Sequence, residues 1–206
     1  MCSENNTCSV AIRPSWAVWV GIALMALCGG KSWGGDGNHT LYLVDNRSLW
    51  AVGDNDKGQL GDGNLTDRNL SAKVIPFGVL AFAHGARHSL FVNNDGSLWA
   101  MGDNSYGQLG DGSTTDRNAS VKIADANVTA VAAGEHHSLF IKNDGSLWCM
   151  GRNDYGQLGT GDSVEKTSPT LIFSSGVALV EAGSYHSIFV KADGSLWGMG
   201  KNDFGQ

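Results

Sequence analysis

Short apolar runs separated by turn residues recur along this chain. Residues 88–93 read His-Ser-Leu-Phe-Val-Asn, residues 94–96 read Asn-Asp-Gly, and residues 97–102 read Ser-Leu-Trp-Ala-Met-Gly. Asp-Gly between two strand-forming runs is typical of a tight hairpin, because glycine adopts the positive φ that such a turn requires. We therefore predict a β-hairpin here and at the equivalent residues 137–151 and 186–200.

The hairpin belongs to a repeat of 49 residues without insertion or deletion. Its columns are His39, His88, His137 and His186; Trp50, Trp99, Trp148 and Trp197; Gly53, Gly102, Gly151 and Gly200; and Gln59, Gln108, Gln157 and Gln206. Two weaker apolar runs, residues 119–123 and 128–134 in the second repeat, complete four strands per unit. Four strands in about 40–50 residues are typical of a propeller blade.

The sequence therefore predicts an all-β fold, a β-propeller of four-stranded antiparallel blades. Both alternating faces of residues 98–101 are apolar, as expected for a small sheet packed between two neighbours. A solenoid is the alternative, but its all-β units are usually shorter.

The repeat units span residues 39–87, 88–136, 137–185 and, in part, 186–206, so residues 29–206 are expected to form an incomplete propeller of about 3.4 blades. A closed ring needs at least four blades. We expect a fragment of a longer protein, and assembly from several chains is the alternative. The first unit is atypical, because Asn46-Arg47 replaces Asp-Gly and residues 31–36 replace an apolar run, so its early strand is expected to be frayed or missing.

The N-terminal residues 1–28 differ from the repeats and are predicted to be a signal peptide or a membrane anchor. Residues 16–27 are an uncharged apolar run, shorter than the roughly 20 residues of a bilayer span but suited to a signal-peptide core. We expect an extracytoplasmic protein, secreted or membrane-anchored. The start is nearly uncharged and Leu27 is large for a cleavage site, so cleavage and retention both stay open.

Composition and net charge limit the classes of partner that the chain is expected to bind. The net charge of −6 disfavours binding to nucleic acid or to anionic membranes through bulk electrostatics, so membrane contact is expected only through an uncleaved N-terminal segment. The 29 glycines fit turns and loops. Removal of residues 1–28 would leave Cys149 alone, so we expect a small buried thiol and no disulfide.

Three phrases recur in order: Gly-x-x-His-Ser-Leu-Phe, Asp-Gly-Ser-Leu-Trp and Met-Gly-x-Asn-x-x-Gly-Gln-Leu-Gly. Over residues 36–206 this pattern resembles the regulator of chromosome condensation repeat, the α-tubulin-suppressor-like propeller family. The resemblance implies a seven-bladed propeller with about 50 residues in each four-stranded blade. The founding member exchanges nucleotide on a small GTPase and binds chromatin, while other members are secreted, including a bacterial β-lactamase inhibitor. The fold therefore leaves function open, and the functional residues of the exchange factor have no recognisable counterparts here.

The repeated polar columns suggest structure more than chemistry. Histidines one blade apart are too widely spaced for one zinc ion, so we expect each ring nitrogen to bond to nearby backbone, and we expect the tryptophans to pack between blades. Serine and histidine are adjacent along a strand and point to opposite faces, which excludes them as nucleophile and base. Residues 62–67 and 111–116 faintly resemble calcium loops, but turn-forming aspartates explain them better. We predict no metal, no cofactor and no enzymatic activity.

Variation among the repeats indicates where a partner binds. The residues that precede each histidine and those that follow each Met-Gly emerge at the same end of the blade, because the two hairpin strands run in opposite directions. Tyrosine and arginine are favoured interface anchors. An ordinary solvated rim is the alternative. The predicted partner-binding face contains Arg87, Glu135, His136, Tyr185, Asp103, Tyr106, Arg152, Tyr155 and Lys201.

These patterns together favour an exported, non-enzymatic scaffold that recognises a protein or a cell-surface ligand through loops on one face. One alternative is a guanine-nucleotide exchange regulator of a small GTPase, by family analogy. Another is a secreted enzyme inhibitor.

Overall fold

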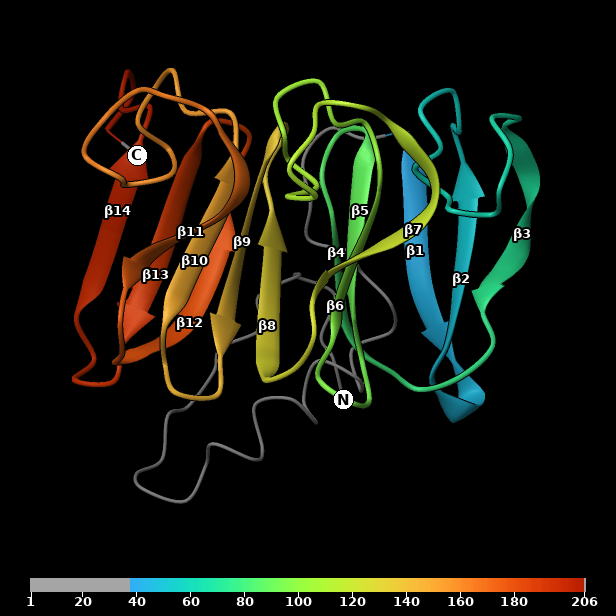
Figure 1. Ribbon diagram of the computed structural model, residues 1–206, viewed down its shortest axis with the longest axis horizontal. Coiled ribbons are helices and arrows are strands. Elements are labelled where there is room, and N and C mark those ends of the chain that lie inside the picture. Colours follow the sequence, from blue (N-terminus) through green and yellow to red (C-terminus); the bar gives the residue numbers. More distant parts are fainter. Residues whose placement is uncertain (1–37, 206) are drawn as a thin grey trace, which may run out of the picture. The chain divides into compact units, whose positions relative to one another are not determined.

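Four antiparallel sheets account for the described part of the chain, residues 38–205, in a computed structural model (Figure 1). The first sheet contains β1 (His39–Val44), β2 (Ser48–Gly53) and β3 (Arg68–Ile75). The second contains β4 (Val79–His84), β5 (His88–Asn93), β6 (Leu98–Gly102) and β7 (Arg117–Ala124). The third contains β8 (Val128–Ala133), β9 (His137–Lys142), β10 (Leu147–Gly151) and β11 (Lys166–Phe173). The fourth contains β12 (Val177–Ala182), β13 (His186–Lys191) and β14 (Leu196–Gly200).

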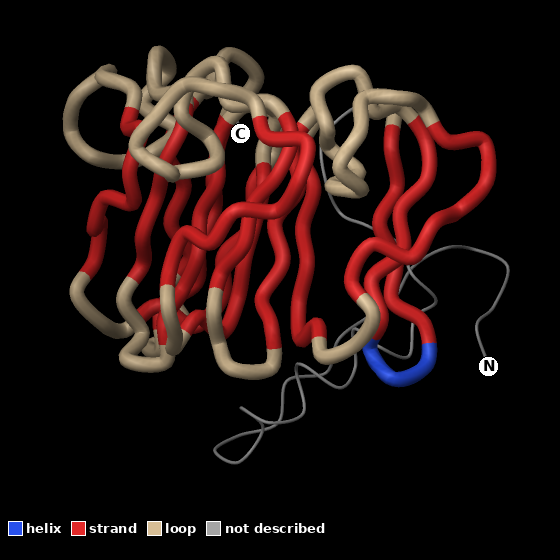
Figure 2. Tube along the Cα trace, turned by 45° about the vertical axis from the view of Figure 1, so that its right-hand side comes forward, coloured by secondary structure: helices blue, strands red, loops and turns tan. Residues whose placement is uncertain are grey.

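This arrangement confirms the predicted all-β, incomplete propeller. Within residues 38–205 the only helical element is the 3-10 turn η2 (Asp45–Arg47), which replaces the Asp-Gly turn in the first hairpin (Figure 2). No helix in that range has the length and apolar character of a membrane span. The predicted signal peptide or anchor at residues 1–28 and the weak early strand of the first unit lie outside the described residues.

The predicted hairpins form at the expected residues. Phe91 pairs with Trp99 in one hairpin, and Phe140 pairs with Trp148 in the next. The turn of the first hairpin contains Gly96, with a φ of 77°, and that of the second contains Gly145, with a φ of 76°. This positive φ is the reason that the turn favours glycine. The local hairpin signal is therefore sufficient to set the register of the central strand pairs.

The sheets are displaced by one strand from the sequence units. Residues 128–134 were predicted to belong with the hairpin that precedes them, but β8 pairs with β9 of the hairpin that follows, with Val131 opposite Phe140. The reason is that a short turn at residues 134–136 brings β8 and β9 together, whereas β7 ends the previous sheet on the far side of β6. Each 49-residue unit therefore contributes strands to two sheets.

Apolar side chains fill the space between consecutive sheets. Leu90 and Leu98 of the second sheet pack with Phe140 and Met150 of the third, and all four are at most 1% exposed. Equivalent clusters join the first sheet to the second and the third to the fourth. Burial of one such side chain stabilises the fold by about 1.5–3 kcal/mol, so these clusters hold the sheets together.

The tryptophans lie at the same junctions and are only partly buried. Trp99 packs beside the cluster between the first and second sheets, and Trp148 beside the next one. Their indole N–H groups donate to Ser97 and Ser146 at 2.8 and 2.9 Å. Trp197 is 46% exposed. Each indole thus combines apolar packing with a satisfied polar edge.

Cys149 is buried and unpaired, and burial raises the pKa of its thiol to about 12. At neutral pH it is therefore a neutral core residue, as a small buried thiol is expected to be.

A hydrogen-bonded chain of side chains connects consecutive repeats. His88 Nε2 lies 2.9 Å from Ser138 Oγ, and Ser138 Oγ donates to the carbonyl of Gln108 at 2.8 Å. Because the hydroxyl has one hydrogen and gives it to that backbone carbonyl, the histidine must donate from Nε2. Burial lowers the pKa of the His88 ring, which is therefore neutral at neutral pH. The chain recurs with Ser89 and Ser187, whose histidine partners are His39 and His137.

The expectation that each histidine bonds to nearby backbone was therefore wrong. The partner is a serine hydroxyl 50 residues later, on the next sheet. The glycine before each histidine allows the ring to approach closely, since a Cβ at Gly134 would overlap the His137 ring.

Ser138→Ala should test this chain. The change leaves the His88 N–H and the Gln108 carbonyl without their partner in a buried site, so the free energy of unfolding should fall by about 1–3 kcal/mol in urea titrations. Ser175→Ala, at an exposed position, should change it by less than about 0.5 kcal/mol. Equal effects of the two changes would contradict a structural role for the hydroxyl.

The histidines should also make stability depend on pH. Burial lowers the pKa of His39, His88 and His137 to about 3 from the ordinary 6.5. As the pH falls from 6.5 toward 3, the unfolded chain binds protons that the folded protein excludes, so stability present above pH 6.5 is lost. Each ring should contribute about 1.4 kcal/mol per pH unit below about pH 6.

Urea unfolding at several pH values measures this slope. His88→Gln keeps a donor for Ser138 but removes one titrating ring, so it should reduce the slope between about pH 6 and 5 by the share of one histidine. An unchanged slope would show that His88 does not resist protonation in the folded protein.

Candidate functional site

The variable positions meet at one end of the sheets, which we call the loop end. It contains the turns at residues 85–87, 134–136 and 183–185 and the loops that follow each hairpin, and it lies at the top of Figure 1. The opposite end, which contains the hairpin turns, is the hairpin end.

Backbone hydrogen bonds join the two variable sets. The N–H of Asp103 donates to the carbonyl of Arg87, that of Arg152 to His136 and that of Lys201 to Tyr185, at 2.8–2.9 Å. The residues before each histidine and after each Met-Gly are therefore direct neighbours at the loop end.

A buried asparagine holds each long loop in place. Asn153 is fully buried, its Oδ1 accepts the Leu158 N–H at 2.9 Å, and its Nδ2 donates to the carbonyl of Asp162 at 2.8 Å. Gln157 Oε1 accepts the Tyr155 N–H at 3.0 Å. Asn55 and Asn104 make equivalent bonds. No role was predicted for these asparagines from the sequence, although they recur at a spacing of 49 residues.

The aspartates of the faint calcium loops have other partners. Asp111 accepts hydrogen bonds from Asn104 and Ser113 and forms an ion pair with Arg117 at 2.6 Å. Asp62 pairs with Arg68 in the same way. No group of three or more His, Cys, Asp or Glu side chains suited to a metal ion occurs within residues 38–205. These aspartates shape the loops.

Six of the predicted residues form what we call the loop-end cluster: Tyr106, His136, Arg152, Tyr155, Tyr185 and Lys201. At its centre the Arg152 guanidinium carbon lies 5.0 Å from the centroid of the Tyr106 ring and 5.8 Å from those of Tyr155 and Tyr185. These distances fit cation–π contacts. Since the three tyrosines come from different turns and loops, the cluster spans the second to fourth sheets.

Lys201 extends the cluster on the fourth sheet. Its ammonium lies 5.3 and 5.5 Å from the rings of Tyr155 and Tyr185, which contact each other edge-on at 5.5 Å. Lys201 also pairs with Asp203 at 3.1 Å, as Arg152 does with Asp154 at 2.7 Å. The bond to Asp154 raises the pKa of Arg152, which stays charged. The cations are thus held between tyrosine rings and carboxylates.

An acidic edge borders the cluster on the second sheet. The His136 ring lies 3.5 Å from Asp103 and 3.4 Å from Glu135, and 5.0 Å from the ring of Tyr106. Burial alone would raise the pKa of Asp103, but the neighbouring His136 and hydrogen bonds from Ser105 lower it below its ordinary range. Asp103 is therefore a buried anion, 3% exposed, beside the imidazole.

The side chain of Arg87 lies apart from these residues, although its backbone carbonyl accepts the Asp103 N–H. Its side chain is 47% exposed and pairs with Asp56 of the first repeat at 3.3 Å. The structure therefore joins eight of the nine predicted residues, including Asp103 and Glu135, and leaves Arg87 in a separate ion pair.

The histidine–serine pairs do not form a catalytic site. A histidine 2.9 Å from a serine hydroxyl has the spacing of a base and a nucleophile. However, His88 donates in this contact, the serine hydrogen goes to Gln108, and His88 and Ser138 are fully buried. Neither proton transfer nor substrate access fits this geometry.

Models of one family match the repeats. They are described as the Regulator of chromosome condensation (RCC1) repeat, and they match residues 95–141 and 144–190 and, in a second version, 80–108, 128–157 and 177–206. Together these segments cover residues 80–206 without a gap, more than half of the chain. No curated protein sequence matches the chain significantly.

Solved structures share the fold. Human WBSCR16 is 26% identical with a TM-score of 0.71, over 80% of this chain and 45% of that chain. Yeast RCC1 (Prp20) bound to Kap60 is 24% identical with a TM-score of 0.69, over 82% and 42%. Prp20p from Saccharomyces cerevisiae, described with its binding properties to Gsp1p and histones, is 26% identical with a TM-score of 0.67, over 81% and 44%. The chain spans less than half the length of each.

Asn153→Ala should loosen the loop that carries Arg152 and Tyr155. The change leaves the Leu158 N–H and several carbonyls unpaired, so we expect a loss of about 1–3 kcal/mol in the free energy of unfolding and faster proteolysis within residues 154–165. Asn69→Ala, at an exposed position, is the matched control and should behave like the parent protein. Unchanged cleavage in Asn153→Ala would show that this side chain does not hold the loop.

Proposed function

Because the chain belongs to the regulator of chromosome condensation (RCC1) repeat family, we propose that it is a non-enzymatic recognition module that binds a protein or a cell-surface ligand at its loop end. Propellers of this family serve as interaction scaffolds or regulators. The observation that carries the proposal is the loop-end cluster, in which Arg152 contacts tyrosines from three segments of the chain.

The composition of the cluster fits a binding surface. Tyrosine and arginine are over-represented among residues that dominate binding energy. They occupy positions that vary between repeats, whereas the packing columns between the sheets stay constant. Tyr155 is 43% exposed, so a partner has access to its ring.

The loops support recognition because they are already ordered. Asn104 and Asn153 are buried and bonded to four or more groups each. A surface that is ordered before binding loses little conformational entropy on association. The rigid loops therefore favour a partner with a defined shape.

Charge makes a protein the preferred partner over nucleic acid. Arg87, Arg152 and Lys201 each have an acidic neighbour within 3.3 Å, and the chain carries a net charge of −6. A surface of alternating charges lacks the positive potential that attracts a phosphate backbone. Directional contacts with polar and aromatic groups of a protein suit it better.

Location separates this proposal from its alternatives. We propose an extracytoplasmic protein, secreted or anchored, from the apolar run at residues 16–27. The similarity to Prp20p, described with its binding to Gsp1p, supports exchange regulation of a small GTPase as a second candidate. A secreted enzyme inhibitor is a special case in which the loop end covers an active site. Detection of the chain outside the cell would exclude the second candidate.

Photo-crosslinking tests the loop end directly. Replacement of Tyr155 by p-benzoylphenylalanine should yield a covalent adduct with a specific protein in the native host, and the same group at Asn143, on the hairpin end, should not. Arg152→Ala should weaken binding of the identified partner by at least about tenfold, or 1.4 kcal/mol. Arg47→Ala, at the hairpin end, removes the same charge and should leave affinity unchanged. Identical adducts at both ends, or a twofold or smaller effect of Arg152→Ala, would contradict the proposal.

A further inference from the structure

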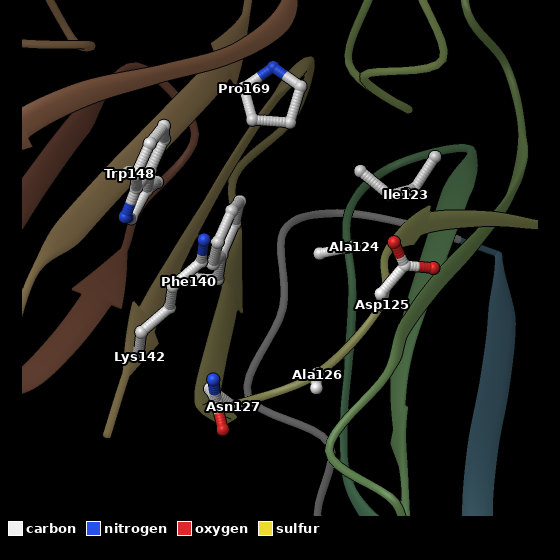
Figure 3. Close-up of a pocket in the computed structure, with 9 residues that line it drawn as sticks. All are labelled: Ile123, Ala124, Asp125, Ala126, Asn127, Phe140, Lys142, Trp148 and Pro169. Carbon is white, nitrogen blue, oxygen red and sulfur yellow. The ribbon is translucent and has the colours of Figure 1, made fainter. Parts of the chain in front are cut away.

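A pocket lies at the hairpin end between the second and third sheets. Figure 3 shows Ile123 and Ala124 on one side, facing Phe140, Lys142 and Trp148, with Pro169 above them. The Phe140 ring is 1% exposed and forms part of the apolar lining, while Trp148 is partly exposed. The pocket belongs to the end of the strands opposite the loop-end cluster.

At the neighbouring junctions larger side chains occupy the position of Ala124. Addition or subtraction of one 49-residue repeat leads to Phe173 and Ile75. Phe173 packs against Phe189 with ring centroids 5.0 Å apart, and Ile75 packs with the cluster between the first two sheets. The pocket is therefore the volume that a side chain fills elsewhere in the same protein.

The junction between the third and fourth sheets shows which group fits this volume. There, the Lys191 ammonium lies 4.7 Å from the centroid of the Phe173 ring and 4.1 Å from that of Trp197. Lys142 and Trp148 are the equivalents of Lys191 and Trp197 around the pocket, and Lys142 lies 4.4 Å from the Trp148 ring. The protein thus presents a phenyl site with its lysine and tryptophan in place but without the phenyl ring.

The positive charge of Lys142 favours an aromatic group in the pocket. No carboxylate within residues 38–205 lies within 4.0 Å of the Lys142 ammonium, whereas Lys122, nearby on β7, pairs with Asp125 at 3.7 Å. An ammonium without an ion-pair partner attracts the negative face of an aromatic ring, and the partly exposed Trp148 ring lies beside it for a second contact. We propose that this pocket binds an aromatic side chain of a partner polypeptide.

This site goes beyond the recognition at the loop end and does not depend on it. A partner that inserts a phenyl group here contacts the outer part of the junction between two sheets. The chain therefore has two surfaces for polypeptides, one at each end of its strands.

Titration with N-acetylphenylalaninamide, followed by NMR, tests the pocket in the whole chain. We expect saturable shifts of the Trp148 indole N–H with a dissociation constant on the order of 1 mM. N-acetylalaninamide and N-acetylleucinamide should shift it much less. Equal binding of the leucine compound, or no saturable shift up to the solubility limit of the probe, would overturn the proposal.

Two variants exchange the properties of neighbouring junctions. Ala124→Phe places the ring of the next junction in the pocket, so it should keep the fold and weaken probe binding by at least about tenfold. Phe173→Ala opens the equivalent space and should create a second site, reported by the indole N–H of Trp197. Probe affinity at Trp148 within twofold of the parent in a folded Ala124→Phe would overturn the proposal. If Ala124→Phe fails to fold, the test rests on Phe173→Ala. Probe binding reported by Trp197 in that variant supports the proposal, and the absence of such binding overturns the proposal. Arg152→Ala should leave probe binding unchanged.

Discussion

The hydrogen-bonded chain from histidine to serine to a glutamine carbonyl is the interaction on which the stacking of the sheets depends. Apolar clusters between the sheets supply most of the stabilisation, but apolar contact is non-directional and allows sheets to slide. Three polar groups with obligatory geometry, buried where water cannot replace them, allow one relative position. The chain therefore explains why histidine and serine recur together at a spacing of 49 residues. The glutamine contributes only its backbone carbonyl to this chain, and its side chain accepts an N–H of its own loop.

That fixed position sets the geometry of the loop end. Arg152 belongs to the third repeat and Tyr106 to the second, and their contact at 5.0 Å requires that the two sheets keep one spacing and one register. The buried asparagines then hold each loop relative to its own sheet. The geometry of the loop end consequently depends on two sets of polar contacts, the histidine–serine contacts between sheets and the asparagine contacts within loops. The variable side chains take part in neither set, so they can change without disturbing these contacts.

Local signals in the sequence predicted the hairpins, the four strands per repeat and the end at which the variable residues emerge, because turn type and strand direction are properties of adjacent residues. The pairing of β8 with β9 was not predicted, since the choice between two flanking hairpins depends on the three-dimensional path of the chain. The serine partner of His88 was missed for the same reason, as it lies 50 residues away on another sheet. The pocket beside Ala124 was visible only as a small residue in a column with isoleucine and phenylalanine, and its meaning required the packing of Phe173 on Phe189.

The one-strand displacement between sequence units and sheets has a consequence for evolution. A genetic exchange at the histidine that begins each sequence unit cuts through a sheet, between β4 and β5 for example, so the new protein must build one sheet from two parental sources. An exchange at residues 125–127, between β7 and β8, would instead transfer a sheet intact but would create a new interface between unrelated apolar faces. Recombination in this architecture therefore requires that either the strand pairing or the packing between sheets stays compatible. The residues that recur at a spacing of 49 keep both compatible, which allows units to be duplicated and exchanged along the chain.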